Sequence, residues 1–393
     1  MQLVKPYQMF EYPSDNLNNV QMSLLEKGIR QLIIDSDMKA DGIDLRFENE
    51  PDFFRSLDFF GDKHKVVYAL FPGTSDRISS LGIHSTRTVF LDGLPSEIAY
   101  IHHLRIHPEK RGGNLLYRGY QAFRQAAGLS SPRCTITSIL AENTAAVSIL
   151  ENPEGRGSLP SYKKICKYLT AIFPVKFPLK RWPLLKRSKN QGDANSSRNN
   201  SGLSGRMLTA ADSSALVALF SAYGKINNGV PYIDENKLKN NQEVISQLKI
   251  SDFFGLFHEN ELVAATGFWD QNKYKQIILR RIPFFLKFFL KLFRLYPENG
   301  KINLIYLDPW AFKPDLEKIY SAELFRMVFN ELSNSDYTFA AWGAPENHPA
   351  CREVMKKMIY IPYRSFIYTV EWPETSKFFL NSSANSVFPL GML

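Results

Sequence analysis

Apolar residues recur along the first half of the chain at two spacings, one typical of helices and one typical of strands. Large apolar side chains mark one side of a helix predicted over residues 19–34: Met22, Leu25, Ile29 and Leu32. Strands are predicted over 66–71, 78–93, 97–107 and 134–140, helices over 115–127 and 144–150, and a closing hairpin over 162–174. This order predicts an α/β fold of the α+β type, with a mixed sheet that has helices on both faces.

A similar order of elements returns in the second half. Helices are predicted over 208–223, over 316–332 and after Pro349, and strands over 302–310, 337–343 and 364–372. A hairpin over 252–269 is expected to turn at Glu259 and Asn260, which are typical turn residues. The repeated order predicts two tandem domains of one architecture, each with a mostly antiparallel central sheet flanked by helices.

Residues 188–205 separate these halves and consist mainly of Ser, Asn and Gly with single charges. Such a composition offers no apolar face for packing and is typical of a flexible linker. We therefore predict four parts of the chain: an N-terminal domain over 1–175, a basic segment and linker over 176–206, a C-terminal domain over 207–376, and a tail over 377–393.

Composition agrees with a folded protein of two domains. Of the 393 residues, 44% are hydrophobic and 13% are aromatic, which is enough for two buried cores and argues against a disordered or fibrous chain. The three cysteines are too few and too scattered for a disulfide framework or a zinc site, so we expect no metal. Because the sequence lacks a secretory leader and a long apolar run, we expect a cytoplasmic protein.

The net charge of +9 is concentrated rather than spread over the chain. Two stretches without acidic residues, 175–189 and 280–294, carry most of the surplus. A nucleic-acid-binding face is therefore not expected. In the second stretch, Lys287, Lys291 and Arg294 share one side of a helix otherwise made of Phe and Leu. This helix either packs between the domains with its lysines reaching water, or touches anionic lipid at a membrane surface.

The candidate chemistry lies at the end of the strand over residues 97–107. Regular alternation would place Tyr100 and His102 on one face, together with Leu104 and Ile106, and His103 on the other. We therefore expect only one histidine of the pair to face a given cleft. Imidazole titrates near neutrality and suits the removal of a proton from an attacking amine, so His102 is the candidate base and Tyr100 its neighbour.

A tight turn follows this strand. Pro108 ends the strand, and the two glycines of Arg111, Gly112, Gly113 and Asn114 permit close approach of a ligand to the backbone. The helix predicted from about Leu115 directs its unpaired N–H groups and the positive end of its dipole over the turn. This arrangement suits a phosphate, with Arg111 adding charge at the rim.

The run Ile106-x-Pro108-x-x-Arg111-Gly112, between a strand and a helix, resembles motif A of the GNAT acyltransferase superfamily. The resemblance covers most of residues 1–175 and implies that the loop holds the pyrophosphate of acetyl-CoA or another acyl-CoA. Asn143 and Ala146 also match the family's strand-end Asn-x-x-Ala helix, which assigns Asn143 to the cofactor. Backbone groups from Leu104 to Ile106 are expected to polarise the thioester carbonyl.

The sequence departs from the family pattern at two positions. The family loop usually reads Arg-Gly-x-Gly-x-Gly/Ala, whereas Asn114 and Leu116 replace two expected small residues here. The family's frequent tyrosine acid falls on Leu150, so the leaving thiolate would need another proton source. The alternative interpretations are a solvated charge for Arg111 and a simple helix cap for Asn143.

Residues 207–376 also resemble a GNAT domain, through the runs GFWDQNKYKQIIL and GAPENHPACREVMKK. The stretch DPWAFKPDLEK, read as the turn after the central strand, has no glycine and contains Asp308, Asp315 and Glu317. Because acids there would repel a pyrophosphate, we expect a degenerate or substrate-shaping domain.

The sequence thus predicts an acyl-CoA-dependent N-acyltransferase that transfers its acyl group directly to an amine. A non-catalytic acyl-CoA sensor or scaffold, and a membrane-surface enzyme acting on a lipid amine, are the alternatives. The acceptor, the acyl chain length and the oligomeric state stay open.

Overall fold

The computed structural model describes residues 5–15, 17–36, 44–127, 132, 134–151, 159–175, 202–240, 242–243, 245–292, 295–297, 299–372 and 385–393. The basic stretch beyond Val175 and most of the linker predicted over 188–205 lie outside these residues, whereas residues 203–205 belong to a strand.

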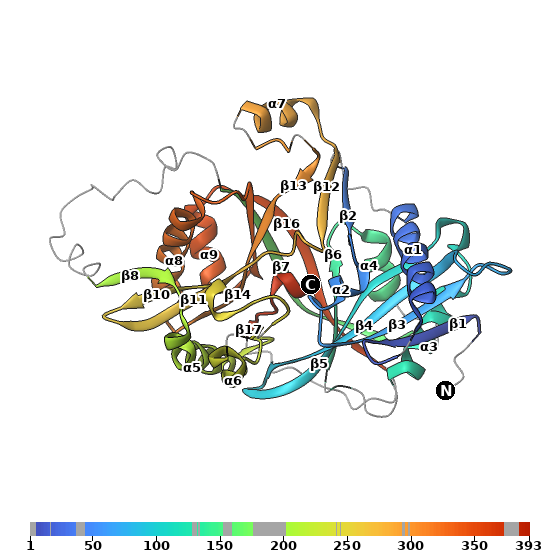
Figure 1. The fold of residues 1–393 in the computed structure, drawn as a ribbon, viewed down its shortest axis with the longest axis horizontal. Helices are drawn as coiled ribbons and strands as arrows, with labels where there is room; N and C mark the ends of the chain where they lie inside the picture. The colour runs from blue at the N-terminus through green and yellow to red at the C-terminus, as the bar shows by residue number, and fades with distance from the viewer. Residues whose placement is uncertain are drawn as a thin grey trace.

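The first half forms one side of the molecule (Figure 1). Its strands are β1 (Tyr7–Tyr12), β2 (Asp44–Glu48), β3 (Lys63–Leu70), β4 (Ile78–Leu91), β5 (Leu94–Ile106), β6 (Cys134–Leu140) and β7 (Ser161–Pro174). Its helices are α1 (Asn19–Asp35), α2 (Phe53–Leu57), α3 (Leu115–Ala127) and α4 (Thr144–Glu151). The strongest sequence patterns, at α3 and β6, predicted the observed bounds.

The second half repeats this order. Its strands are β8 (Leu203–Met207), β9 (Asn227–Asn228), β10 (Phe253–His258), β11 (Glu261–Trp269), β12 (Gln276–Arg281), β13 (Lys301–Ile302), β14 (Leu304–Phe312), β15 (Phe339–Pro345), β16 (Ile361–Glu371) and β17 (Asn385–Ser386). Its helices are α5 (Ser213–Gly224), α6 (Glu235–Lys239), α7 (Phe284–Leu292), α8 (Glu317–Leu332) and α9 (Pro349–Lys357).

One mixed sheet runs through both halves and joins them by exchanging strands. Its 12 strands follow the order β1-β3-β4-β5-β6-β16-β7-β15-β14-β11-β10-β8. Strand β16 comes from the second half but pairs with β6, whereas β7 comes from the first half but pairs with β15. The two exchanged strands also pair with each other, from Ile361 opposite Ile172 to Glu371 opposite Ser161. The halves therefore share one continuous sheet.

Two expectations from the sequence are corrected by this sheet. The stretch read as a hairpin over 162–174 is the single strand β7, because β16 pairs with it from Ser161 to Ile172 and β15 pairs with its residues 168–174. Asp308 lies inside β14 rather than in a turn, so the turn before α8 contains only the last part of the DPWAFKPDLEK run. The predicted class, a mixed sheet flanked by helices, is confirmed.

The end of the chain packs between the two halves near the centre of Figure 1. Val387, Phe388 and Met392 are buried, and the Phe388 carbonyl accepts a hydrogen bond of 2.8 Å from the Tyr168 hydroxyl. Residues 385–393, predicted as part of a tail, thus contribute to the shared core.

Helix α7 stands out from the body at the top of Figure 1, beyond the small sheet of β13, β12 and β2. The side chain of Phe284 is 84% exposed and that of Phe288 is 58% exposed. One interpretation of the sequence was that this helix packs between the domains. Its two phenylalanine side chains are not buried in that way.

Candidate functional site

A β-bulge interrupts β5 at the predicted histidine pair. Ile83 of β4 lies opposite His102, but Leu81 lies opposite Arg105, so His103 and Leu104 together face Gly82. His103 has a φ of +53°, which non-glycine residues rarely adopt. A bulge leaves the extra residue unpaired in the ladder and redirects its side chain. The backbone of β5 is therefore irregular at this point, on the side that pairs with β4.

The bulge also corrects the alternation expected for the two histidines. His102 Nδ1 and His103 Nδ1 lie 2.6 Å apart, within hydrogen-bonding distance. In a regular strand these side chains would point to opposite faces. Here both imidazoles belong to one cluster.

His102 is buried in an aromatic environment. Its ring stacks against Phe60 with centroids 4.3 Å apart and against Tyr100 at 5.2 Å, while its Nε2 lies 2.7 Å from Ser85 Oγ. Burial lowers the pKa of His102 well below its usual value, and the neighbouring His103 lowers it further. The ring is therefore neutral at physiological pH, which leaves one nitrogen able to accept a proton.

His103 is less buried than His102 and lies edge-on to Phe53, with ring centroids 5.6 Å apart. Burial, followed by the charges of Arg105 and Lys275, lowers its pKa to about 3. Tyr100 donates to or accepts from Ser138 Oγ at 2.7 Å, and burial raises the pKa of Tyr100 to about 12. Tyr100 therefore keeps its proton at neutral pH.

Strands β5 and β6 separate just before the bulge. Their parallel pairing runs from Ile98 opposite Cys134 to Tyr100 opposite Ile136. One residue farther on, the Thr137 hydroxyl bridges to the Ile101 carbonyl at 2.8 Å. Beyond this point β5 pairs with β4 on its other side, whereas β6 continues along β16. The edge of β5 that carries Leu104 and Ile106 thus faces the divergence.

The glycine turn lies at the end of this edge. Arg111, Gly112, Gly113 and Asn114 are all exposed, and Gly112 has a φ of +78°. The Asn114 carbonyl accepts the first helical hydrogen bond from the Arg118 N–H at 3.0 Å, so α3 begins directly after the turn. The first N–H groups of α3 have no partner within the helix and project toward the turn.

Of the two residues that depart from the family loop, Asn114 is exposed and Leu116 packs against protein. Leu115 and Leu116 are half-buried against a small core cluster that includes Tyr120 and Phe123. The Leu115 carbonyl also accepts a hydrogen bond of 2.7 Å from the Tyr7 hydroxyl. The exposed part of the turn is therefore formed by small or polar residues and Arg111.

Two further positions named from the sequence have clear structural roles. Asn143 Oδ1 accepts a hydrogen bond of 3.2 Å from the Ala146 N–H, which makes it the cap of α4. Leu150 is buried in the same small core cluster as Tyr120. Asn143 and Leu150 lie where β6 leads into α4, beside the point at which β5 and β6 separate. Each has a structural role, Asn143 as a helix cap and Leu150 as a core residue.

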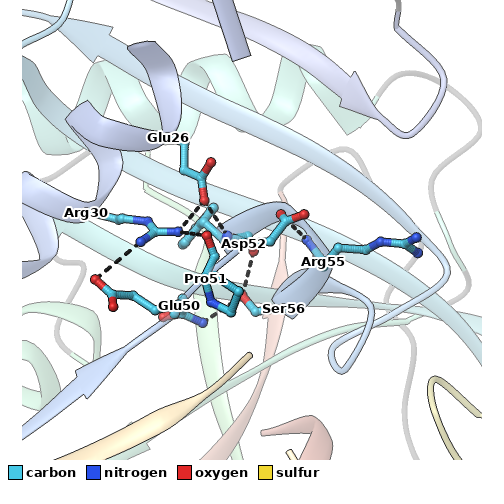
Figure 2. Close-up of polar contacts among 9 residues, drawn as sticks. Glu26, Arg30, Glu50, Pro51, Asp52, Arg55 and Ser56 are labelled. Carbon is cyan, nitrogen blue, oxygen red and sulfur yellow. Dashed lines mark hydrogen bonds and ion pairs between the residues drawn. The ribbon is translucent and has the colours of Figure 1, made fainter. Parts of the chain in front are cut away.

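Helix α2 is anchored to α1 by a polar network (Figure 2). Its Phe53 lies edge-on to His103. Glu26 Oε1 accepts hydrogen bonds from Arg30 Nη2 at 2.5 Å and from the Phe53 N–H at 2.6 Å. Arg30 also pairs with Glu50 at 3.3 Å and donates to the Pro51 carbonyl. This network fixes Phe53 and the chain that leads from α2 to Phe60.

Several residues of the site were not identified from the sequence. Ser85 and Phe60 are two of them, and they line a small pocket of about 10 Å³ beside Tyr100, together with Phe388, Met392 and Leu393 from the end of the chain. Lys275 reaches the site from the second half and lies over the Phe60 ring at 5.0 Å. Burial lowers the pKa of Lys275 to about 8. These residues come from segments far apart in the sequence, so their proximity is visible only in three dimensions. The apolar character of the last residues was the one sequence signal that they are buried.

The corresponding turn of the second half, between β14 and α8, has different chemistry. Asp315 has a φ of +67°, and Glu317 is the first residue of α8. Burial raises the pKa of Glu317. This turn presents carboxylates where the first half presents glycines.

Among the described residues, no group of three or more His, Cys, Asp and Glu side chains is arranged to hold a metal ion. No helix in the described part of the chain is long and apolar enough to cross a membrane.

The sequence matches no model of a known protein family, and no curated protein sequence matches it. Solved structures do match. N-myristoyltransferase from Saccharomyces cerevisiae with bound myristoyl-CoA is similar over 99% of this chain and 90% of its own, at 12% identity and a TM-score of 0.57. A second structure of that enzyme with myristoyl-CoA covers 100% of this chain and 86% of its own, at 11% identity and a TM-score of 0.55.

The chain shares the fold of this N-myristoyltransferase. A GCN5-related N-acetyltransferase from Anabaena variabilis is also similar, over 92% of this chain and 72% of its own, at 8% identity and a TM-score of 0.45. The mixed α/β fold expected from the sequence agrees with the likeness to the yeast enzyme, which extends through both halves.

Proposed function

We propose that this protein is an acyl-CoA-dependent N-acyltransferase that passes an acyl group from the thioester directly to an amine. The observation that carries the proposal is the succession of three features along the end of β5 and the turn that follows it. The exposed turn at Gly112, the divergence of β5 from β6 and the bulge at His103 follow one another without interruption. A CoA diphosphate at the turn would direct its thioester toward the bulge.

In this proposal the backbone binds most of the cofactor. The N–H groups from Gly112 to Leu115 bind the diphosphate, because a helix N-terminus favours anions, and Arg111 adds charge at the exposed rim. Backbone groups of Leu104 and Ile106 bind the pantetheine arm and polarise the thioester carbonyl. Asn143 contributes from the far side of the divergence, where it caps α4.

The amine loses a proton as it attacks the thioester, and we assign its removal to the histidine pair through His102. Both imidazoles are neutral at physiological pH, as a base must be. Tyr100 stacks on His102 and holds its ring in place.

We further propose that acetyl-CoA is preferred over long-chain acyl-CoA. The pocket beside Tyr100 and Ile136 has a volume of only about 10 Å³ and is filled by Phe60, Phe388 and Met392. A volume of this size is close to the minimum that holds one water molecule.

The test is release of free CoA thiol from acetyl-CoA, butyryl-CoA and myristoyl-CoA with a panel of primary amines. We expect the highest rate with acetyl-CoA and a loss of about a hundredfold in His102→Ala, the size typical of a lost acid or base. His258→Gln, at the end of β10, serves as the control and should keep the wild-type rate. CoA binding without turnover would favour a sensor or scaffold, and no CoA binding would reject the proposal.

A membrane surface is a second candidate location, favoured by the exposure of Phe284 and Phe288 on α7. Arg280, Arg281 and Lys291 are exposed on or just before this helix, so its surface combines apolar and basic groups, as interfacial helices do. Flotation with anionic vesicles should capture the wild type, and both Phe284→Ser/Phe288→Ser and neutral vesicles should abolish capture. Absence of flotation with anionic vesicles would reject this location.

We also propose that the second half shapes the acceptor site and binds no CoA, with domain boundaries at residues 175 and 207. The carboxylates at Asp315 and Glu317 would repel a diphosphate, and Lys275 reaches the histidines of the first half.

A further inference from the structure

A chain of hydrogen-bonding side chains crosses the sheet from the bulge to the far side of β3. His103 Nδ1 lies 2.6 Å from His102 Nδ1, and His102 Nε2 lies 2.7 Å from Ser85 Oγ. Ser85 Oγ in turn lies 2.7 Å from His64 Nδ1. His64 Nε2 lies 3.6 Å from Asp58 Oδ1. Each contact except the last is short enough for direct proton transfer.

Strand register explains why these side chains meet. His64 of β3 lies directly opposite Ser85 of β4, and His102 of β5 lies opposite Ile83, two residues from Ser85. The chain thus runs across three neighbouring strands rather than along one. Cross-strand neighbours on one face are close enough for side-chain contact.

The middle of the chain is buried and both ends are more accessible. Ser85 and His64 are each 1% exposed, and His102 is 6% exposed. His103 is half-buried at the bulge, and the Asp58 side chain is 33% exposed. Asp58 also lines a polar pocket of about 320 Å³ together with Arg55, Glu243 and Lys273. A proton that reaches Asp58 has therefore left the buried sheet.

We propose that His103, His102, Ser85 and His64 form a proton relay that carries the proton of the acceptor amine from the bulge to Asp58. This inference rests on the proposed acyl transfer and names the route by which its proton leaves. Only His103 would touch the amine, whereas Ser85 and His64 act through the histidines.

The relay balances with every imidazole neutral before and after the step. At the start His103 carries its proton on Nδ1, His102 and His64 carry theirs on Nε2, and Asp58 is ionised. The amine nitrogen gives a proton to His103 Nε2 while its lone pair forms the bond to the acyl carbon. Each group then passes its own proton onward: His103 Nδ1 to His102 Nδ1, His102 Nε2 to Ser85, Ser85 to His64 Nδ1, and His64 Nε2 to the Asp58 carboxylate. The thiolate of CoA leaves with the former thioester electron pair.

A relay fits this environment better than storage of the proton on one imidazole. Burial lowers the pKa of both His102 and His103, and the ammonium group of Lys275 lowers both further. Burial also opposes any imidazolium, because a charge loses its solvation there. A shift of tautomers leaves no lasting charge on the rings.

Packing holds the rings of the relay in position. Phe60 and Tyr100 stack on His102, and Tyr12 stacks on His64 with centroids 5.9 Å apart. The network between α1 and α2 (Figure 2) holds the start of α2, and Asp58 is the residue that ends this helix. Fixed donors and acceptors are what transfer through several groups requires.

The experiment measures kcat for acyl transfer in mixtures of H₂O and D₂O. In the wild type we expect a curved dependence on the deuterium fraction, because several protons move together. Ser85→Ala and His64→Gln should each lower kcat by about tenfold or more at unchanged KM for acyl-CoA and give a linear dependence. His84→Gln, a buried histidine next to Ser85 and outside the chain, is the matched control and should keep both the rate and the curvature.

Two results would overturn the relay while leaving acyl transfer intact. One is a linear dependence of kcat on the deuterium fraction in the wild type. This result does not depend on whether any variant folds. The other is an unchanged kcat in folded Ser85→Ala and His64→Gln. A wild type that binds acyl-CoA but never turns over would overturn the relay together with the proposed function.

Discussion

Gly112 and Asp315 share a left-handed backbone conformation, with φ of +78° and +67°, in the two turns that join a central strand to the following helix. The left-handed position of this turn is thus a glycine in the first half and an aspartate in the second. The first turn exposes amides and Arg111, which suit an anion, whereas the second adds negative charge. This difference is the basis for assigning the cofactor to the first half.

Gly112→Ala should weaken CoA binding about fivefold. A left-handed alanine costs about 1 kcal/mol, so the turn would shift away from the conformation that exposes its amides. Gly73→Ala is the matched control, because Gly73 has a φ of +76° and open space around an added Cβ but lies in the turn between β3 and β4. Isothermal titration with CoA should separate the two variants. Equal affinity in both would contradict a role for the Gly112 conformation.

Lys275→Met should raise the pKa of His103 from about 3, because a positive charge that opposes its protonation is removed. The pKa of His103 should stay below its usual value, since burial is the larger cause. Lys273→Met, at the neighbouring surface pocket, should leave the titration unchanged. NMR of 15N-labelled histidine side chains across pH measures both. A pKa of His103 that does not move would place Lys275 too far away to act.

Gly82→Ala should destabilise the fold by about 1–3 kcal/mol, the usual cost of overpacking. An added Cβ would lie 2.3 Å from the Phe123 ring and 2.9 Å from Leu104 Cδ2, opposite the bulge. Combining it with Phe123→Leu should cost less than the sum of both changes, because the ring is what the methyl group meets. Thermal unfolding is the measurement. Strict additivity would show that the methyl group is accommodated elsewhere.

Asp308→Asn should remove part of the pH dependence of stability. Burial raises the pKa of Asp308 from 3.8 to about 8, although the Gly391 N–H and Arg87 oppose the rise. The folded state therefore holds this proton more tightly. The resulting stability is complete below pH 3.8 and is lost as the pH rises through about 8. The melting temperature of the wild type should fall relative to the variant between these values, and parallel profiles would argue against a protonated Asp308.

The sequence predicted the parts of the fold that depend on local pattern. The helix over 115–127 and the strand over 134–140 agree with the structure because their apolar spacing is regular and their ends carry clear signals. The exchange of β7 and β16 was not predictable, because the two strands have similar sequence patterns. Their partner strands also lie far away in the chain. Packing of residues 385–393 between the halves likewise depends on a surface that both halves form.

The site was predicted in part for the same reason. The turn at Gly112 is visible in the sequence because glycine and a helix start are local features. The contact between His102 and His103 was missed because alternation assumes a regular strand, and the bulge at His103 breaks it. Ser85, His64 and Lys275 carry no motif, and only the strand register brings them to the histidines.

The most direct test of the account is hydrogen exchange of backbone amides with and without CoA. We expect CoA to slow exchange at residues 112–117, where the turn meets α3, and to leave residues 315–319 at the start of α8 unchanged. Protection at the second turn, or no protection at the first in a folded sample saturated with CoA, would contradict the claim that the first half binds the diphosphate.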